Sequence, residues 1–210
     1  MSHVTLLGDS IFDNGRYVPG GSPVVEQLRG RLPRGWRATL LAVDGAVAAD
    51  VPRQLARLPA DATHVVVSAG GNDALENGRM IDDPDLTAPE AFAALADAQG
   101  RFHDDYRAML RAVLAAGRPT VVCTVYDAVP GLAREAVAAL SVFNDVILRE
   151  AFRAGLPVLD LRLVCADPGD YSAVSPIEPS VAGGVKIALG IAGIVTGHDF
   201  GSGRTVVYGR

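Results

Sequence analysis

Cysteine is scarce in this 210-residue sequence, which contains only Cys123 and Cys165. Their separation matches no metal-binding spacing, and we expect both to be reduced thiols. Positive charge is also in deficit, with 19 Lys and Arg against 24 Asp and Glu. The chain therefore lacks the basic surface that binds nucleic acid or an anionic membrane. No apolar run approaches the roughly 20 residues of a membrane span.

The first residues lack the features of a signal peptide. Residues 1–8 contain neither a basic segment nor an apolar stretch of the required length. We therefore expect a cytoplasmic protein. The chain contains no internal repeat, low-complexity segment or linker, and 49% of its residues are apolar. These features predict a single domain over residues 1–210 with a sizeable core.

Short β-branched runs alternate with longer segments that are rich in alanine and leucine. The runs predict five strands, and the segments between them have apolar residues at helical spacing. Strands are expected at residues 3–7, 38–43, 64–69, 120–125 and 156–161. Helices are expected at residues 24–32, 50–58, 88–117, 132–154 and 181–195. The sequence GSGRTVVYG near the C-terminus is compatible with a short extra strand, whose place in the sheet the sequence does not give.

This alternation predicts an α/β fold built on a parallel sheet. Strands that are apolar throughout are buried on both faces, and intervening helices imply right-handed crossovers. In such sheets, sites gather beyond the carboxyl ends of the strands. The segments that follow the strands are residues 8–10, 44–46, 70–73, 126–127 and, at some distance, 175–180. We expect them to converge on one crevice.

Three of these segments together favour acyl transfer. A serine hydroxyl that attacks a carbonyl needs preorganised donors for the oxyanion that forms. Ser10 can supply the nucleophile and a backbone N–H, Gly45 a second N–H, and Asn72 a side-chain amide. Each motif alone is equally typical of a turn, and Asn72 alone of a helix cap. Their common position after strands is what favours a site.

The sequence GDSIFDNG, the pair Asp44-Gly45 and the sequence GGND resemble the first three blocks of the SGNH, or GDSL-type, hydrolase family. The resemblance covers most of the chain. It implies a three-layer α/β/α, flavodoxin-like fold with about five parallel strands, and esterase or related acyl-hydrolase activity without metal or cofactor. It also implies that Ser10 is the nucleophile and that Ser10, Gly45 and Asn72 form the oxyanion hole. The G-x-S-x-G elbow of the α/β-hydrolases is absent from the sequence.

The last block departs from the family pattern. Where the family has an Asp and, three residues later, a His that acts as the base, this sequence has Ser175 and Glu178. Glu178 is the best candidate base, provided that apolar neighbours such as Pro176 and Ile177 raise its pKa. Asp127 is a candidate auxiliary group that shares its proton or orients it. The alternative is that Glu178 caps the last helix or pairs with a nearby cation.

None of the four histidines offers a strong substitute. His3 and His64 begin strands and so belong at the opposite edge of the sheet. His198 follows the last helix, and His103 lies midway along a long helix beside acidic neighbours, as surface histidines do.

The sequence thus predicts a serine-dependent esterase that acts on a small ester or acyl substrate with an atypical base. Two alternatives stay open: a non-catalytic member that binds a ligand in the same crevice, and an acyltransferase that uses the same serine. Residues 77–87 are expected to form a polar loop that shapes the pocket. Neither the substrate nor the oligomeric state can be inferred from the sequence.

Overall fold

Six strands, all parallel to their neighbours, form the centre of the protein in a computed structural model that describes residues 1–78 and 86–209. Their order is β2-β1-β3-β4-β5-β6. The first five strands follow the flavodoxin-like order 2-1-3-4-5. The strands are β1 (His3–Gly8), β2 (Arg37–Leu40), β3 (His64–Ser68), β4 (Thr120–Cys123), β5 (Val158–Leu159) and β6 (Val207–Tyr208).

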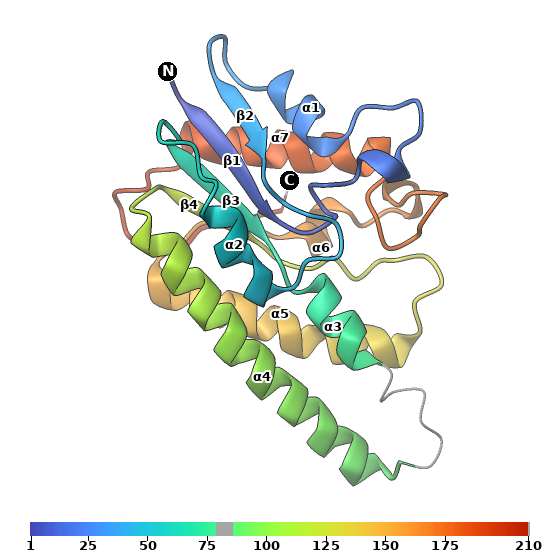
Figure 1. Ribbon diagram of the computed structural model, residues 1–210. Coiled ribbons are helices and arrows are strands. Elements are labelled where there is room, and N and C mark those ends of the chain that lie inside the picture. The colour runs from blue at the N-terminus through green and yellow to red at the C-terminus, as the bar shows by residue number, and fades with distance from the viewer. Residues whose placement is uncertain (79–85, 210) are drawn as a thin grey trace.

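Helices cover both faces of the sheet, which confirms the predicted three-layer α/β/α fold (Figure 1). Helices α1 and α7 lie on one face, and α2, α4 and α5 lie on the other. The α-helices are α1 (Val24–Arg29), α2 (Val51–Leu55), α3 (Gly71–Asn77), α4 (Ala88–Ala115), α5 (Arg134–Ala154), α6 (Leu161–Val164) and α7 (Val181–Gly197). Short 3₁₀ turns are η1 (Gly15–Tyr17), η2 (Ala48–Asp50) and η4 (Pro168–Asp170).

The long helix α4 shows why the sequence predicts these elements well. Thr87 and Glu90 form a capping box at its start, and Pro89 lies in its first turn. The helix ends at Ala115, and Gly117 then takes a positive φ of 65°. The termination expected from the glycine is thus observed at the chain reversal into β4.

The sheet and its connections differ from the prediction in several places. Strands β2, β4 and β5 end earlier than expected, and α6 begins at Leu161, where a strand was expected. The sheet has six strands, because the C-terminal segment of unassigned position adds β6 beside β5. Only two residues of β6 pair with β5. Its position is therefore determined by the free edge of β5 and not by the hydrophobic pattern of its own sequence. The GGND segment opens helix α3, where the sequence analysis expects no helix.

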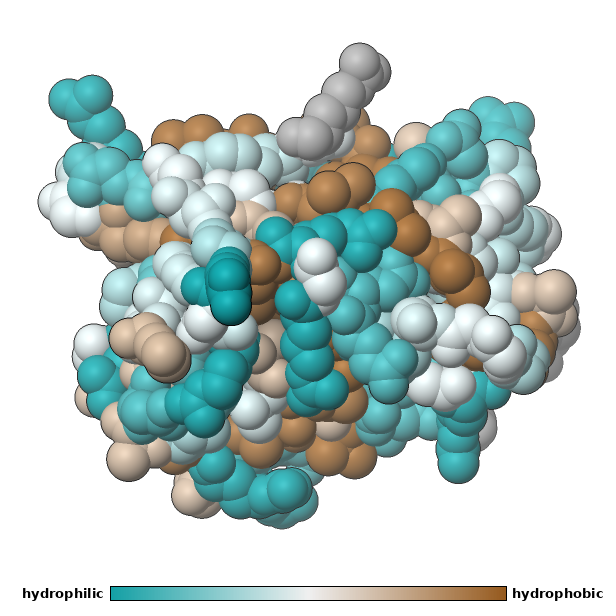
Figure 2. Space-filling view, turned by 90° about the horizontal axis from the view of Figure 1, so that it is seen from above, coloured by the Kyte–Doolittle hydropathy of each residue, from teal (hydrophilic) through white to brown (hydrophobic). Residues whose placement is uncertain are grey.

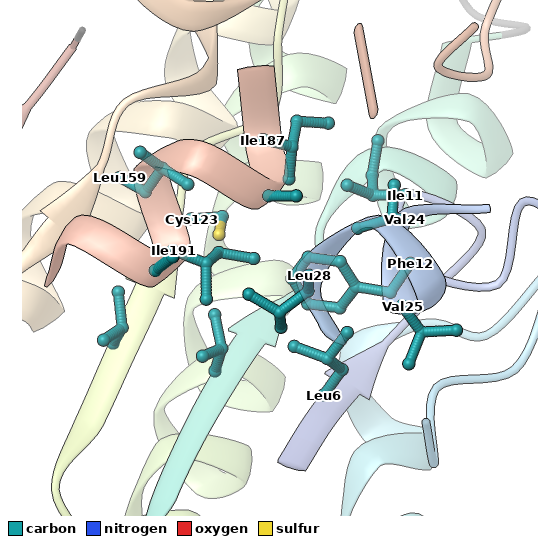
Figure 3. Packing of buried hydrophobic residues seen from close by; sticks show 14 of the residues in the cluster. Leu6, Ile11, Phe12, Val24, Val25, Leu28, Cys123, Leu159, Ile187 and Ile191 are labelled. Carbon is teal, nitrogen blue, oxygen red and sulfur yellow. The ribbon is translucent and has the colours of Figure 1, made fainter. Parts of the chain in front are cut away.

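The core consists of two apolar clusters, one on each face of the sheet. Figure 3 shows the cluster beneath α1 and α7, where Phe12 lies beside Leu28 of α1 and Ile191 of α7 approaches the sheet. The thiols of Cys123 and Cys165 are buried in this cluster and form no disulfide. Burial raises the pKa of both thiols, so they stay protonated.

The outer surface mixes polar and apolar residues. In the view from above, hydrophilic residues are interspersed with hydrophobic ones (Figure 2). Within the described parts of the chain, no helix is both long enough and apolar enough to cross a bilayer.

Candidate active site

The end of β1 is built to turn the chain sharply. Gly8 has a φ of 123°, and a Cβ at this position would overlap the Ser68 carbonyl oxygen. The buried Gln54 side chain accepts a hydrogen bond from the Gly8 N–H and donates one to the Gly8 carbonyl, both at 2.7 Å. Only glycine satisfies this geometry, which explains why a glycine ends the strand.

Ser10 follows this turn and is anchored on both sides. The Asp9 N–H donates to the Ser68 carbonyl at 3.1 Å, and the Asp9 side chain accepts from the Ile11 N–H at 3.1 Å. Ile11 and Phe12 then enter the core beneath α1 (Figure 3). Ser10 itself is 7% exposed and lines a cleft. The predicted nucleophile therefore has a fixed backbone and a face open to a ligand.

The cleft has a volume of about 140 Å³ and lies at the carboxyl end of the sheet, as predicted. Its walls come from the β1 turn, α3, α4, the β4–α5 connection, α5 and the loop before α7. Ser10, Asn72 and Glu178 all line it. Residues 10, 72 and 178 are thus brought together from distant parts of the sequence.

The loop before α7 holds Glu178 inside this cleft. The Glu178 N–H donates to the Ser175 carbonyl at 3.1 Å, and the Glu178 carbonyl accepts from the Ser172 N–H at 2.8 Å. The Glu178 side chain is 4% exposed, and its Oε2 has no hydrogen-bond partner in the described parts of the chain. Such an orphaned buried oxygen is costly and is typical of a functional site.

Burial raises the pKa of Glu178 to about 7. The nearby Ser10 hydroxyl opposes this rise, and the negative charge of Asp44 adds to it. A carboxyl with this pKa accepts a proton near neutral pH far better than an ordinary glutamate does. Glu178 is therefore buried as expected, although Pro176 and Ile177, the neighbours expected to bury it, are themselves exposed.

The alternative roles for Glu178 were to cap the last helix or to pair with a nearby cation, and the described residues support neither. Ser180 caps α7, and its side chain accepts from the Gly183 N–H at 3.2 Å. Within residues 1–78 and 86–209, Glu178 forms no ion pair. Glu178 is thus neither the cap of α7 nor the partner of a described cation.

Asn14 links the two halves of the site, a role that sequence reasoning missed. Its fully buried side chain donates to the Pro179 carbonyl at 3.2 Å and accepts from the Val24 N–H at 3.0 Å. Asn14 therefore joins the segment after Ser10 to the residue that follows Glu178. The only signal in the sequence is a polar residue in an otherwise apolar stretch close behind the serine.

Asn72 lies in the first turn of α3 and lines the cleft. Its side-chain amide donates to the Ala46 carbonyl at 2.9 Å, which leaves one amide hydrogen for a ligand. The next residue, Asp73, accepts from the Ala48 N–H at 3.1 Å. Both bonds attach the start of α3 to the loop that contains Gly45.

Gly45 occupies a turn that the Ala46 N–H closes on the Val43 carbonyl at 3.1 Å. It has a φ of 83° and is exposed, beside the cleft rather than among its lining residues. In the described chain, neither the Gly45 N–H nor the Ser10 N–H donates a hydrogen bond to another group. Both predicted backbone donors are thus available to a ligand.

Three polar side chains near the Gly45 turn, those of Asp44, Tyr17 and Arg16, form a polar group close to Glu178. The Asp44 carboxylate accepts from the Tyr17 hydroxyl at 2.9 Å and from Arg16 at 3.2 Å. Asp44 raises the pKa of Glu178, and Glu178 in turn contributes to the raised pKa of Tyr17. This polar group therefore borders the candidate base.

Two more buried carboxyls lie nearby. Burial raises the pKa of Asp9 to about 8, although a hydrogen bond from the Ile11 backbone opposes the rise. Burial likewise raises the pKa of Asp73 to about 6, against its hydrogen bond from the Ala48 backbone. Asp9 is buried beside Ser10, but its carboxyl already accepts the Ile11 N–H. Asp9 and Glu178 both line the cleft, but the Oε2 of Glu178 is the one that is buried without a partner in the described chain.

Asp127 lies apart from the cleft lining. Its charge contributes to the raised pKa values of Arg162 and Tyr171, not to that of Glu178. The arrangement gives no support to its predicted auxiliary role.

All four histidines lie in the described chain, and none lines the cleft. His103, the strongest substitute base in the sequence, is bonded to Glu150 of α5 at 2.8 Å. His3 contacts Asp61 and Thr39, His64 contacts Trp36 and Phe200, and His198 contacts Tyr208.

Of the loop predicted to shape the pocket, Asn77 belongs to α3 and lines the cleft together with Gly78. Residues 79–85 lie outside the described residues.

Comparison with known proteins places this geometry in context. Residues 6–183 match the profile of the GDSL-like lipase/acylhydrolase family. No curated protein matches the chain. Similar crystal structures include an extracellular lipase from Streptomyces rimosus, with 21% identity, a TM-score of 0.66 and coverage of 95% of this chain and 100% of that one.

Two further crystal structures share the fold at low identity. Phospholipase A1 from Streptomyces albidoflavus NA297 is 18% identical, with a TM-score of 0.67 and coverage of 94% of this chain and 99% of that one. A catalytic mutant of an acetylxylan esterase from Geobacillus stearothermophilus is 19% identical, with a TM-score of 0.62 and coverage of 95% of both chains. At these identities the likeness concerns the fold.

Proposed function

We propose that Ser10 and Glu178 are the nucleophile and base of a serine esterase, on the premise that the chain belongs to the GDSL-like lipase/acylhydrolase family. The protein is thus an enzyme of a family that hydrolyses esters, and the proposal concerns how it does so. The observation that carries it is that Ser10 shares a cleft with a buried, unpaired carboxyl whose pKa is about 7.

In the acylation step, the Ser10 Oγ attacks the ester carbonyl carbon while the Glu178 carboxylate takes the hydroxyl proton. The new O–C bond gives a tetrahedral oxyanion. When the oxyanion collapses, the bond to the leaving alcohol oxygen breaks, and Glu178 returns the proton to that oxygen. The products are an acyl-serine and a free alcohol.

In the deacylation step, water attacks the acyl-serine carbonyl and gives a proton to Glu178. Collapse then breaks the bond to the Ser10 Oγ, which recovers the proton from Glu178, and a carboxylic acid leaves. The carboxyl group acts alternately as base and acid. A pKa near 7 suits both roles at neutral pH.

Three donors are proposed to stabilise the oxyanion: the Ser10 N–H, the Gly45 N–H and the Asn72 amide. The two backbone groups donate to no other group in the described chain, and the bond from Asn72 to Ala46 fixes the amide beside the Gly45 turn. One such donor typically lowers the barrier by about 2.7–4 kcal/mol.

The direct test is labelling with a fluorophosphonate probe, followed by hydrolysis of a short p-nitrophenyl ester. Native protein is expected to be labelled at Ser10, and Ser10→Ala is expected to lose both labelling and hydrolysis while its thermal unfolding is unchanged. Unchanged turnover in Ser10→Ala would remove Ser10 from the mechanism.

The same experiment separates the two alternative functions. An unlabelled native protein that turns over no ester supports a non-catalytic ligand-binding protein. Labelling together with transfer of the acyl group to added alcohols, in preference to water, supports an acyltransferase. The cytoplasmic location stays a prediction from the sequence.

A further inference from the structure

The two sides of the cleft differ in chemistry around Ser10. On one side is Glu178, near the polar side chains of Asp44, Tyr17 and Arg16, which do not themselves line the cleft. On the other side, α3, α5 and the β4–α5 connection present mostly apolar side chains. This apolar portion includes Leu75 of α3, Leu132 of the connection, and Ala136, Ala139, Leu140 and Phe143 of α5.

One face of α5 forms much of this wall. Ala136, Ala139, Leu140 and Phe143 follow the i, i+3, i+4, i+7 spacing that places residues on a single helix face. Two of the four are alanines, so the wall is recessed where longer side chains would fill the cleft. Phe143, only 2% exposed, forms a fixed part of this wall.

The size of the cleft limits what it can hold. Its volume is about 140 Å³. In another protein, a dry cavity of about 150 Å³ with a similar apolar lining accepts benzene, which has six carbons. Part of this volume lies beside Ser10, Asn72 and Glu178, and an acetyl group would leave the apolar remainder empty or filled with poorly bonded water.

The reaction chemistry decides which part of an ester lies on each side. Glu178 must reach the leaving alcohol oxygen to return its proton, so the alcohol belongs on the polar side. The acyl chain then extends from the carbonyl at Ser10 toward α3 and α5. We infer that the enzyme selects esters with an apolar acyl chain of about six carbons, and that the Ala136–Ala139 face of α5 sets this length. The inference rests on the proposed function.

Two isomeric esters test the assignment of the two sides. Ethyl hexanoate and hexyl acetate have the same atoms, but the six-carbon chain lies on the acyl side in one and on the alcohol side in the other. With about fourfold per buried methylene, kcat/KM is expected to be roughly 10²-fold higher for ethyl hexanoate than for ethyl acetate. Hexyl acetate is expected to stay near ethyl acetate. A higher kcat/KM for hexyl acetate than for ethyl hexanoate would overturn the assignment.

A matched pair of variants tests the length limit. Ala139→Phe fills the recess, and the ratio of kcat/KM for ethyl hexanoate to that for ethyl acetate is expected to fall at least tenfold. Ala138→Phe places the same side chain on the exposed neighbour, which does not line the cleft, so this ratio is expected to stay within about threefold of native. Equal ratios in the two variants would overturn the role of this face.

Calorimetry with ethyl hexanoate and Ser10→Ala keeps the inference separate from the esterase proposal. If native protein hydrolyses no ester, the proposed function fails, yet binding that Ala139→Phe abolishes and Ala138→Phe preserves would still support the chain site. If ethyl hexanoate binds no better than ethyl acetate, the chain site fails whether or not Ser10 reacts.

Discussion

The two segments that supply the reacting pair are held in different ways. The Ser10 turn follows a central strand, and the Gln54 side chain, the Ser68 carbonyl and the core residue Phe12 fix it. The Glu178 loop belongs to no strand beyond a single antiparallel bridge between Tyr171 and Pro179.

This loop is positioned instead by single hydrogen bonds, some within the loop and some to distant residues. The Ser172 N–H donates to the Glu178 carbonyl, the Ser172 hydroxyl donates to the Tyr17 carbonyl at 2.5 Å, and Asn14 donates to the Pro179 carbonyl. The Tyr126 hydroxyl also donates to the Ile177 carbonyl at 2.6 Å. The nucleophile thus depends on the sheet, whereas the base depends on a few separate hydrogen bonds of its loop. The predictions below test this difference.

After the loss of Ser10 itself, Glu178→Gln is expected to have the largest effect on catalysis, because the amide keeps the shape of the side chain but cannot accept the Ser10 proton. The expected loss in kcat is about 10²–10⁴-fold, the usual contribution of a general base. Steady-state kinetics on a p-nitrophenyl ester measures it, with thermal unfolding as the control for folding. Full Ser10-dependent activity in this variant would make Glu178 a structural residue.

Asn72→Ala is expected to lower kcat by roughly 10²–10³-fold, with a smaller effect on KM. The reason is that the amide serves a charge that exists only in the transition state. The variant also loses the bond to the Ala46 carbonyl, so circular dichroism and thermal unfolding must show that α3 is intact. A change confined to KM would instead make Asn72 a ground-state binding residue.

The pH profile is expected to follow the titration of Glu178. Its pKa is raised to about 7, so the carboxyl is protonated and inactive as a base below that pH, and ionised above it. The value of kcat/KM is therefore expected to rise about tenfold per pH unit up to pH 7 and then to level off. An ester without titratable groups gives the cleanest measurement. A profile that is flat from pH 5 to pH 8 would contradict the assignment.

The different ways in which the Ser10 turn and the Glu178 loop are held also explain how much of the site could be predicted from the sequence. The position of Ser10 at the end of β1 was predictable because a buried strand, a glycine and a serine are adjacent in the chain, so their geometry is local. The helical state of Asn72 was not predicted, because glycine and asparagine favour turns. Helix α3 begins there because Asn72 and Asp73 bond to residues 46 and 48, which are distant in sequence.

The setting of Glu178 shows the same limit more strongly. Its position was predicted by alignment with the family's last block, but its environment depends on Asn14, Tyr17 and Ser172. No periodic pattern encodes such contacts. Strand β6 was likewise unplaced, because two paired residues carry too little pattern to choose an edge.

Asp9→Asn is expected to have the smallest effect, and it concerns stability. Asp9 is 3% exposed, and burial raises its pKa to about 8, well above the value near 3.9 of an unfolded chain. Between these two values the folded state binds the extra proton, so its stability falls as the pH rises from about 4 to about 8.

An asparagine removes this titration and can still accept the Ile11 N–H through its side-chain carbonyl. The variant is therefore expected to be more stable than native protein at pH 8.5 by about 1–3 kcal/mol, or roughly 2–10 °C in Tm. The gain should shrink toward zero near pH 4, and calorimetry at the two pH values measures it. The kinetic inflection near pH 7 should persist in this variant, because it belongs to Glu178. If the inflection disappeared, the titrating group would be Asp9, and the proton acceptor would then lie on the rigid segment beside the nucleophile.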